Sequence, residues 1–386
     1  MSAVEEFLAE QGDSLIAFRR DLHAHPELGW EERRTTERIV AELSAAGLAP
    51  RRLPRGTGVV CDVGENPVVG LRADIDALPV TDGSSAPYRS TVDGVCHACG
   101  HDVHTTVVLV AGRYLAGLAA ADALPRGVRL LFQPAEERVP GGALELVEHG
   151  ALEGLERVFA LHCDPAIEVG RVGLRVGAVT SATDSIEVRL TGPGGHTARP
   201  HRTADLVAAL GEMVSRVPAV LARRVDPRAG VNLVWGEVHA GNAVNVIPRE
   251  GVASGTLRML DRTVWETVPT LLAATVRDVV APYGVEVEVT HTRGVPPVVN
   301  DALPVAELRA AATTMLGDMA ACDTEQSLGG EDFGWLLEKV PGALARLGVR
   351  TPGDLDAADL HQPTFDVDER CIGVGIRLLV GVSLGS

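Results

Sequence analysis

Three short, mostly apolar runs at residues 58–63, 68–73 and 128–132 constrain the fold most strongly. Each has the length of a strand, and the last two are separated by a helical stretch at about residues 102–121. Strands that are apolar on both faces are typical of parallel sheets covered by helices. The succession of strand, helix and strand therefore predicts an α/β domain with a mostly parallel mixed sheet in three layers.

A different pattern begins near residue 179. Residues 184–190 alternate apolar and polar side chains, as a half-exposed antiparallel strand does. The elements expected after it are a helix at 204–220, strands at 231–238 and 251–259, a helix at 262–280 and a strand at 285–291. This β-α-β-β-α-β order predicts a ferredoxin-like α+β domain. We expect it at residues 179–292, inserted between catalytic-domain segments 1–178 and 293–386.

Composition excludes some kinds of partner. The formal net charge of -17 argues against nucleic acid or an anionic membrane surface. No apolar run reaches the roughly 18 residues of a membrane helix; the best, residues 107–124, contains Arg113. The acidic first residues lack a signal-peptide pattern, and six cysteines in 386 residues do not form a disulfide framework. We therefore expect a cytoplasmic protein.

Cysteine and histidine concentrate in one short segment, which contains Cys96, His97, Cys99, His101 and His104. Thiolate and imidazole are preferred ligands of zinc and similar divalent ions. Cys96 and Cys99 alone would also suit a redox pair or a structural zinc knuckle. Since a knuckle needs a second Cys/His pair that is absent at the usual spacing, the segment favours a metal site of another kind.

Carboxylates follow two of the predicted strands. Asp74 and Asp76 come after residues 68–73, and their spacing of two puts both on one face, where they could orient ligand histidines. Glu136 and Glu137 follow Pro134, which ends the strand at 128–132. In extended backbone the two glutamates would point opposite ways, so one could bind a metal while the other acts as general base. Alone, each pair is also typical of a turn or a solvated acidic surface.

Two isolated histidines belong to the same pattern. His162 follows the apolar residues 158–161, and His361 lies in a polar segment near the carboxyl terminus. Either histidine alone would more often be structural. Because the carboxyl ends of parallel strands meet in one crevice, however, the residues that follow them are expected to form a single site.

Six motifs together resemble one known family, the M20 metallopeptidases. The similarity is to its amidohydrolase branch of hippurate hydrolases, N-acetyl-amino-acid deacetylases and auxin-conjugate hydrolases, and it covers nearly the whole chain. The motifs are HAHPEL at 23–28, ADIDALP at 73–79, HACGHDVH at 97–104, FQPAEE at 132–137, GGHTARPH at 194–201 and GEDF at 330–333.

The resemblance implies a dinuclear metal site and hydrolysis of the amide bond of a small N-acyl amino acid, with an acetyl, benzoyl or similar acyl group. Two divalent ions are expected, zinc or manganese first and cobalt or nickel as alternatives. Cys99 would bridge them. The remaining ligands by motif position are His101, Glu137, His162 and His361.

The resemblance also implies roles for residues that do not bind metal. Glu136 matches the general base and Asp76 a carboxylate behind the metal ligands. His196 matches a histidine of the inserted lid domain that, in dimeric relatives, reaches the partner's site and polarises the scissile carbonyl. The positions matching substrate-binding residues are Asn245, Arg258 and Gly330. A homodimer or homotetramer formed through the lid would follow.

The sequence departs from the family pattern at three places. Cys96 stands where methionine is frequent, Cys163 and Asp164 replace an apolar-aromatic pair, and residues 138–140 follow Glu137 where glycine is usual. These changes affect the expected pocket wall more than the ligands. The alternatives are a dipeptidase or aminopeptidase of the same family, or a metal-storing or redox-sensing protein built on Cys96 and Cys99.

Overall fold

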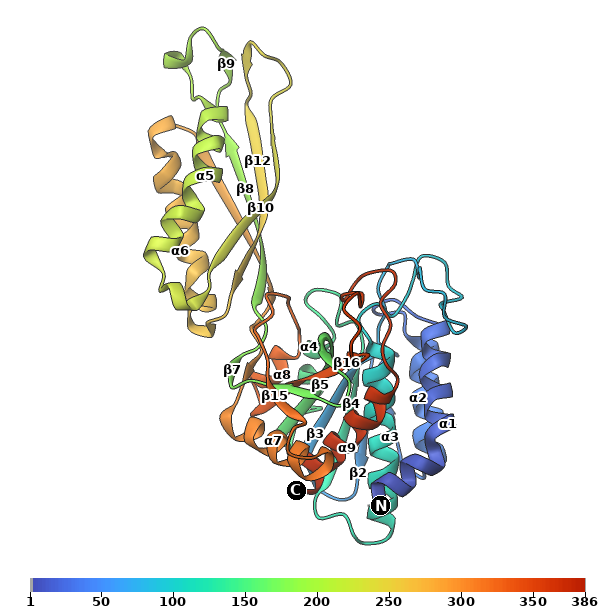
Figure 1. Ribbon diagram of the computed structural model, residues 1–386. Coiled ribbons are helices and arrows are strands. Elements are labelled where there is room, and N and C mark those ends of the chain that lie inside the picture. Colours follow the sequence, from blue (N-terminus) through green and yellow to red (C-terminus); the bar gives the residue numbers. More distant parts are fainter. Residues whose placement is uncertain (1–2, 386) are drawn as a thin grey trace. The chain divides into compact units, whose positions relative to one another are not determined.

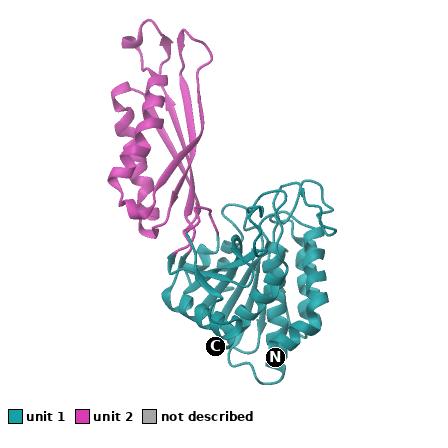
Figure 2. Ribbon diagram, in the orientation of Figure 1, with its two compact units in different colours: residues 1–177, 299–325, 332–386 teal, residues 178–298, 326–331 magenta. Residues whose placement is uncertain are grey.

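The computed structural model describes residues 3–385 (Figure 1), which form two compact units (Figure 2). The first unit runs to residue 177 and includes residues 299–325 and those from 332 onward. The second unit contains residues 178–298 and 326–331, so it is longer than the expected 179–292. Backbone bonds explain the extension: Val179 N–H donates to Val298 O and Ser181 N–H donates to Gly329 O.

The first unit contains the predicted mostly parallel mixed sheet. Four of its neighbouring strand pairs are parallel: β4 with β3, β3 with β5, β5 with β16, and β6 with β15. In spatial order the strands are β1 (Arg51–Arg52), β2 (Val59–Val63), β4 (Gly127–Gln133), β3 (Pro67–Asp74), β5 (Arg157–Glu168), β16 (Gly342–Arg350), β6 (Val172–Leu174) and β15 (Ala321–Asp323).

Side chains on both faces of this sheet are buried. Along β4, Leu130 packs into the core cluster that includes helix α3, whereas Leu131 points the other way, near Gly70 and Leu155. Helices α1, α2 and α9 each contact α3, as Figure 1 shows. The helices of this unit are α1 (Ala3–Ala24), α2 (Arg33–Ala45), α3 (His101–Ala120), α4 (Ala143–Glu148), α7 (Ala302–Leu316), α8 (Gly334–Leu337) and α9 (Arg370–Leu384).

Helix α3 is, within residues 3–385, the one helix long and apolar enough to cross a membrane by composition. Most of its side chains are buried inside the first unit, from His101 through Gly112. Burial of this kind is typical of a core helix.

The order of the strands has a switch point at β3, and the edge of the sheet formed by the carboxyl ends of β3 and its neighbours is called the crevice. The chain passes from β3 through α3 to β4 on one side of β3, and then through α4 to β5 on the other side. Where successive connections leave a strand in opposite directions, the carboxyl ends of the strands border an open crevice that commonly binds ligands. A ligand site is therefore expected at the carboxyl ends of β3, β4 and β5.

Strand β5 does not end at Leu161, as the sequence pattern predicted, but continues to Glu168. The reason is that β16 keeps pairing with it, through Arg346 opposite His162 and on to Arg350 opposite Glu168. Pro165 is accommodated because the pairing is irregular between Gly348 and Arg350, and a bulge tolerates a residue without an N–H group.

The second unit has the predicted ferredoxin-like order. Its sheet runs β10 (Asn232–Ala240), β12 (Glu250–Met259), β8 (Ala182–Thr191) and β13 (Glu286–Val295), all antiparallel. Helices α5 (Leu206–Arg224) and α6 (Arg262–Val280) lie side by side on one face (Figure 1). The short strands β9 (Gly195–His196) and β11 (Val246–Ile247) pair within this unit. The short strand β7 (Gly177–Ala178), at the boundary between the units, pairs with β14 (Val299–Asn300) of the first unit.

A buried arginine joins three separate segments of the first unit. The Arg19 side chain, 1% exposed, lies 2.7 Å from the Asp102 carboxylate at the start of α3 and 3.0 Å from Asp366. It also approaches Glu369 at 3.4 Å, while His23 Nδ1 lies 2.8 Å from Asp102. Since a buried cation is tolerated only when it is paired, this cluster ties α1 to α3 and to the chain before α9.

We expect Asp102→Asn to destabilise the protein by about 3 kcal/mol, because removing one partner of a buried ion pair leaves the other charge uncompensated. Urea unfolding in the presence of a chelator measures this loss without a contribution from bound metal. The matched control is Glu37→Gln, which removes the exposed ion pair of Glu37 with Arg52 and should change stability by less than about 0.5 kcal/mol. Equal stability of the Asp102 variant and wild type would contradict the prediction.

Candidate metal centre

The first two candidate ligands are held by the turn that starts α3. Gly100 separates Cys99 from His101 and has a φ of 82°, in the left-handed region that favours glycine. A side chain here would also be excluded by packing, because a Cβ atom on Gly100 would lie 2.7 Å from Cys163 Sγ. The turn brings Cys99 and His101 to the amino end of α3, beside the crevice.

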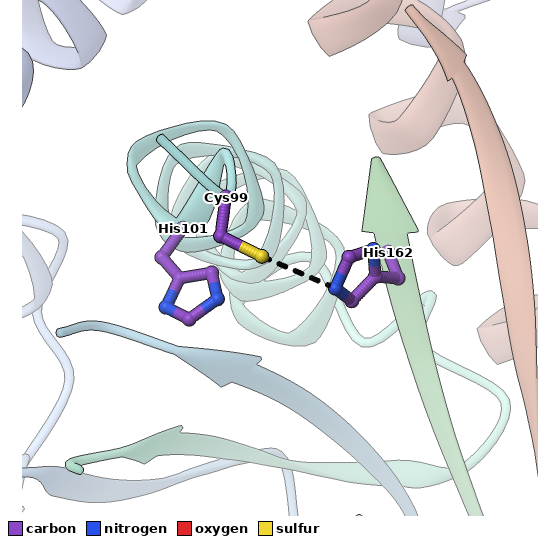
Figure 3. Close-up of side chains that lie close together, drawn as sticks. All are labelled: Cys99, His101 and His162. Carbon is purple, nitrogen blue, oxygen red and sulfur yellow. Dashed lines mark hydrogen bonds between the residues drawn. The ribbon is translucent and has the colours of Figure 1, made fainter. Parts of the chain in front are cut away.

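The five predicted ligands come together in overlapping groups. Cys99 Sγ lies 3.5 Å from Nε2 of His162, which comes from β5 (Figure 3). Potential ligand atoms lie within 4.8 Å of one another in the group Cys99, His101 and His162, and also in the group Cys99, Glu137 and His361. Cys99 belongs to both groups, so its sulfur could contribute to either of them.

His361 is anchored by its backbone. Its N–H donates to Ala98 O at 2.8 Å, its φ is 65°, and its Nε2 lies 3.4 Å from Glu137 Oε1. The imidazole is about half exposed, whereas those of His101 and His162 are buried. His361 therefore closes the solvent side of the ligand cluster.

The two glutamates do not point in opposite directions, contrary to the prediction from extended backbone. Ala135 has a φ of 51°, and the chain turns immediately after β4. Glu136 and Glu137 themselves lie in this turn, and Glu136 Oε2 and Glu137 Oε1 both lie 3.9 Å from Nε2 of His101. One carboxylate beside the other suits the pairing of a ligand with a base that acts next to it.

Asp76 contacts His101 and the backbone of both glutamates through its carboxylate. Its carboxylate lies 3.3 Å from His101 Nδ1, and its two oxygens each accept a bond of 3.0 Å from the backbone N–H of Glu136 and of Glu137. The bond to Nδ1 leaves Nε2 of His101 facing the glutamates, as expected of a carboxylate behind a metal-binding histidine.

His104 is a residue to which the sequence analysis gave no role. Its Nε2 accepts a bond of 2.8 Å from the Cys163 N–H, so Nδ1 carries the proton and donates to Asp74 at 2.6 Å. His104 thus joins α3 to the strand residue that follows His162. Its position three residues after His101 on one helix was the available signal, since such residues share a face.

Beneath the cluster lies a second buried arginine, Arg72 of β3. It donates to Asp74 at 2.7 Å, to Gln133 at 3.0 Å and to Asp332 at 3.1 Å. Asp332, from the GEDF motif, also accepts bonds from Gln133 Nε2. This network holds the ends of β3 and β4 at a fixed spacing below the ligands.

The cluster fits divalent cations by its charge and by its unpartnered atoms. Burial lowers the pKa of His101, but the charges of Asp74 and Asp76 outweigh it and raise that pKa to about 10. Burial, with the charges of Glu137 and Glu136, raises the pKa of the Cys99 thiol well above its usual value. His101 Nε2 and Glu137 Oε1 are buried without hydrogen-bond partners. A bound cation would satisfy both atoms, balance the excess carboxylates and favour the thiolate.

The predicted lid residues all lie in the second unit. His196 on β9 pairs with Val246 on β11, next to Asn245, whose carbonyl accepts a bond from the Thr197 N–H. His196 Nδ1 accepts a bond of 3.1 Å from the Ala198 N–H, so in a neutral imidazole the proton is on Nε2. The side chain is exposed and can act as a hydrogen-bond donor.

Arg258 and Gly330 belong to one packed group of the second unit. Arg258 Nη1 donates to Thr183 Oγ1 at 2.9 Å and to Leu328 O at 2.5 Å. A Cβ atom on Gly330 would lie only 3.1 Å from Thr183 Oγ1. The guanidinium and the glycine are therefore held around Thr183.

Comparison with known families agrees with this geometry. The model of "Peptidase family M20/M25/M40" matches residues 70–384. The chain belongs to this family. The resemblance seen in the motifs is confirmed, and with it the α/β fold and the assignment as a hydrolase of this family. In the crystal structure of YXEP from Bacillus subtilis, described as a dinuclear metal-binding M20 peptidase, 97% of the chain matches 96% of this one with a TM-score of 0.85 and 31% identity.

Two curated relatives extend the comparison. N-acetyl-L-cysteine deacetylase of Bacillus subtilis is 37% identical over 361 residues, which are 93% of this chain and 84% of that protein. A protein of Rhodococcus jostii named putative glutamate–cysteine ligase 2-3 is 48% identical over 371 residues. That match covers 96% of this chain but 46% of the relative, so the chain spans less than half of it.

Replacing Cys99, the predicted bridging ligand, should remove metal. We expect Cys99→Ala to hold fewer divalent ions per chain than wild type and to lose most of the rise in melting temperature that added metal produces, because an ion at 100 times its dissociation constant adds about 2.7 kcal/mol. Elemental analysis and thermal unfolding with and without chelator test this. Cys322→Ala, at a half-exposed thiol outside the ligand groups, is the control. An unchanged metal content in Cys99→Ala would refute the assignment.

Proposed function

We propose that this protein hydrolyses the amide bond between an acyl group and the amino group of an amino acid, using two divalent ions, with zinc or manganese as the first choice. The observation that carries the proposal is the pair of ligand groups sharing Cys99, with Glu136 beside them. Support comes from relatives named N-acetyl-L-cysteine deacetylase and N-acyl-L-amino acid amidohydrolase. Hydrolysis would release a carboxylic acid and a free amino acid.

Glu136 is the proposed general base. Bound divalent ions would lower the pKa of a water and polarise the scissile carbonyl. Glu136 accepts the proton of the attacking water and then donates it to the nitrogen of the leaving amine. Asp76 keeps the carboxylate in place by holding the backbone N–H of Glu136. One carboxylate can carry out both proton transfers, provided that it faces the candidate metal ligands and that the substrate can reach it.

His196 is the proposed donor to the developing oxyanion. A neutral imidazole whose Nδ1 accepts a backbone bond presents Nε2–H, and such a donor stabilises negative charge on the carbonyl oxygen. We propose that it acts in the active site of a partner subunit. Arg258, whose planar guanidinium suits a carboxylate, is proposed with Asn245 and Gly330 to bind the amino-acid carboxylate of the substrate.

The proposed assembly is a homodimer formed through the second unit, with a homotetramer as the alternative. Its strand β10 is at the end of the four-stranded sheet and exposes Val234 and Val238. Val244 and Val246, in the segment that leads to β11, are also exposed. An edge strand with apolar side chains is a surface that a second copy can cover by strand pairing. The free thiols within residues 3–385 support the cytoplasmic location that we also propose.

Glu136→Gln tests the proposed reaction. We expect its hydrolytic rate to fall by at least about 100-fold while both metal ions remain bound, because glutamine keeps the shape but cannot accept a proton. Metal-loaded wild type and variant are compared on N-acetyl, N-benzoyl and free dipeptide substrates, with N-acetyl-L-cysteine included because of the named relatives. Hydrolysis of free dipeptides alone would favour the dipeptidase alternative. Full turnover by the variant would refute Glu136 as base.

Mixing two inactive variants tests whether His196 acts across subunits. Glu136→Gln and His196→Ala homodimers should each be nearly inactive, but a heterodimer would contain one site with both groups intact. After subunit exchange of an equal mixture, about a quarter of the sites should be active in a two-fold dimer. Rate measurements before and after exchange, with mass determination, provide the check. No recovery in confirmed heterodimers would contradict action from the partner subunit.

A further inference from the structure

Three consecutive backbone N–H groups after β4 are all held by buried carboxylates. Glu136 and Glu137 donate to the two oxygens of Asp76 at 3.0 Å each. The preceding N–H, that of Ala135, donates to Glu32 Oε1 at 2.7 Å. Asp76 leaves β3 at the edge of the crevice, whereas Glu32 comes from the distant segment before α2, to which the sequence analysis gave no role.

Glu32 is not needed by the helix that it precedes. The first turn of α2 is capped by Glu27, whose two carboxylate oxygens accept bonds from the backbone N–H of Arg34 and of Thr35. Glu32 makes no side-chain cap on α2. Its carboxyl group is fully buried and its Oε2 has no hydrogen-bond partner. A buried carboxyl group of this kind is costly to keep, so its contact with Ala135 calls for an explanation.

Ala135 needs an external partner to keep its conformation. Its φ of 51° is disfavoured for a residue with a Cβ atom and persists only where the surroundings fix it. Glu32 fixes its N–H, and the Gly142 N–H donates to its carbonyl at 3.2 Å. The segment before Glu32 packs on the same residue, since a Cβ atom on Gly29 would lie 3.1 Å from Ala135 Cα.

We propose that Glu32 is a positioning residue for the base Glu136: by accepting the Ala135 N–H it holds the left-handed residue that directs the following turn, with Glu136 and Glu137, toward His101. This inference rests on the proposed function of Glu136. The turn is also the feature that the extended-backbone prediction lacked. Burial, and then the charge of Asp76, raises the pKa of Glu32 to about 7, consistent with two carboxyl groups that share one loop.

The test compares three variants. Glu32→Leu removes the acceptor, Glu32→Gln keeps an oxygen for the Ala135 N–H, and Glu27→Gln perturbs the neighbouring carboxylate that caps α2 without touching the loop. We expect kcat of the leucine variant to fall about 10- to 100-fold with KM within about threefold of wild type and metal content unchanged, because a small misplacement of a catalytic group has this cost. Glutamine should restore kcat to within about threefold, and Glu27→Gln should lower the melting temperature alone.

A second readout does not depend on turnover. Hydrogen exchange of the peptide covering residues 133–142 should be faster in Glu32→Leu than in wild type, and unchanged in Glu32→Gln and Glu27→Gln. If the leucine variant does not fold, Glu32→Asp, one methylene shorter, replaces it. Unchanged exchange, or equal kcat losses in the leucine and glutamine variants, would overturn the inference. Faster exchange in Glu32→Leu, combined with a wild-type protein that hydrolyses no N-acyl amino acid, would instead overturn only the proposed function.

Discussion

The first unit depends on keeping buried carboxylates paired at the edge of its sheet. Arg72, on the central strand β3, donates to Asp74, Gln133 and Asp332, and so joins the ends of two strands to the GEDF motif. Asp74 also accepts a hydrogen bond from Nδ1 of His104. The other nitrogen of His104 accepts the N–H of Cys163, the residue after His162. Since a buried charge is stable only when fully partnered, the network tolerates little rearrangement. The paired charges behind the candidate ligands therefore fix the spacing of those ligands.

Left-handed backbone recurs at the points where ligands leave the regular elements. Gly100 separates two ligands, Ala135 precedes the two glutamates, and His361 itself has a positive φ. Each conformation turns a side chain toward the crevice. In a continued helix or strand the same side chain would point elsewhere. Glycine adopts this conformation without strain, whereas Ala135 and His361 need neighbours that fix it, and these are Glu32 for Ala135 and Ala98 for His361.

Both sheet architectures and the gathering of ligands at one sheet edge were predictable from the sequence. Period-two and apolar-run patterns follow directly from which faces are buried, and β3, β4 and α3 begin or end within two residues of the expected positions. The shared direction of the two glutamates was not predictable, because Glu136 and Glu137 lie in a turn that follows Ala135 and not in extended backbone. The Ala135 N–H is bound by Glu32, about a hundred residues earlier. The extension of β5 past Leu161 depended on its pairing with β16. Both features depend on tertiary contacts, and such contacts leave no periodic pattern in the local sequence.

The acidic side chains near the candidate ligands give a reason why the proposed recognition of the substrate carboxylate would fall to the second unit. The first unit gathers the carboxylates of Asp74, Asp76, Glu136 and Glu137 near His101, and divalent ions would offset their charge. In the proposed function those ions and the base would act on the amide. The cation proposed for the carboxylate is Arg258, which belongs to the second unit and is held by Thr183 and Leu328. An enzyme built this way would distinguish its substrates by what the second unit holds, while the first unit supplies a reaction common to many amides.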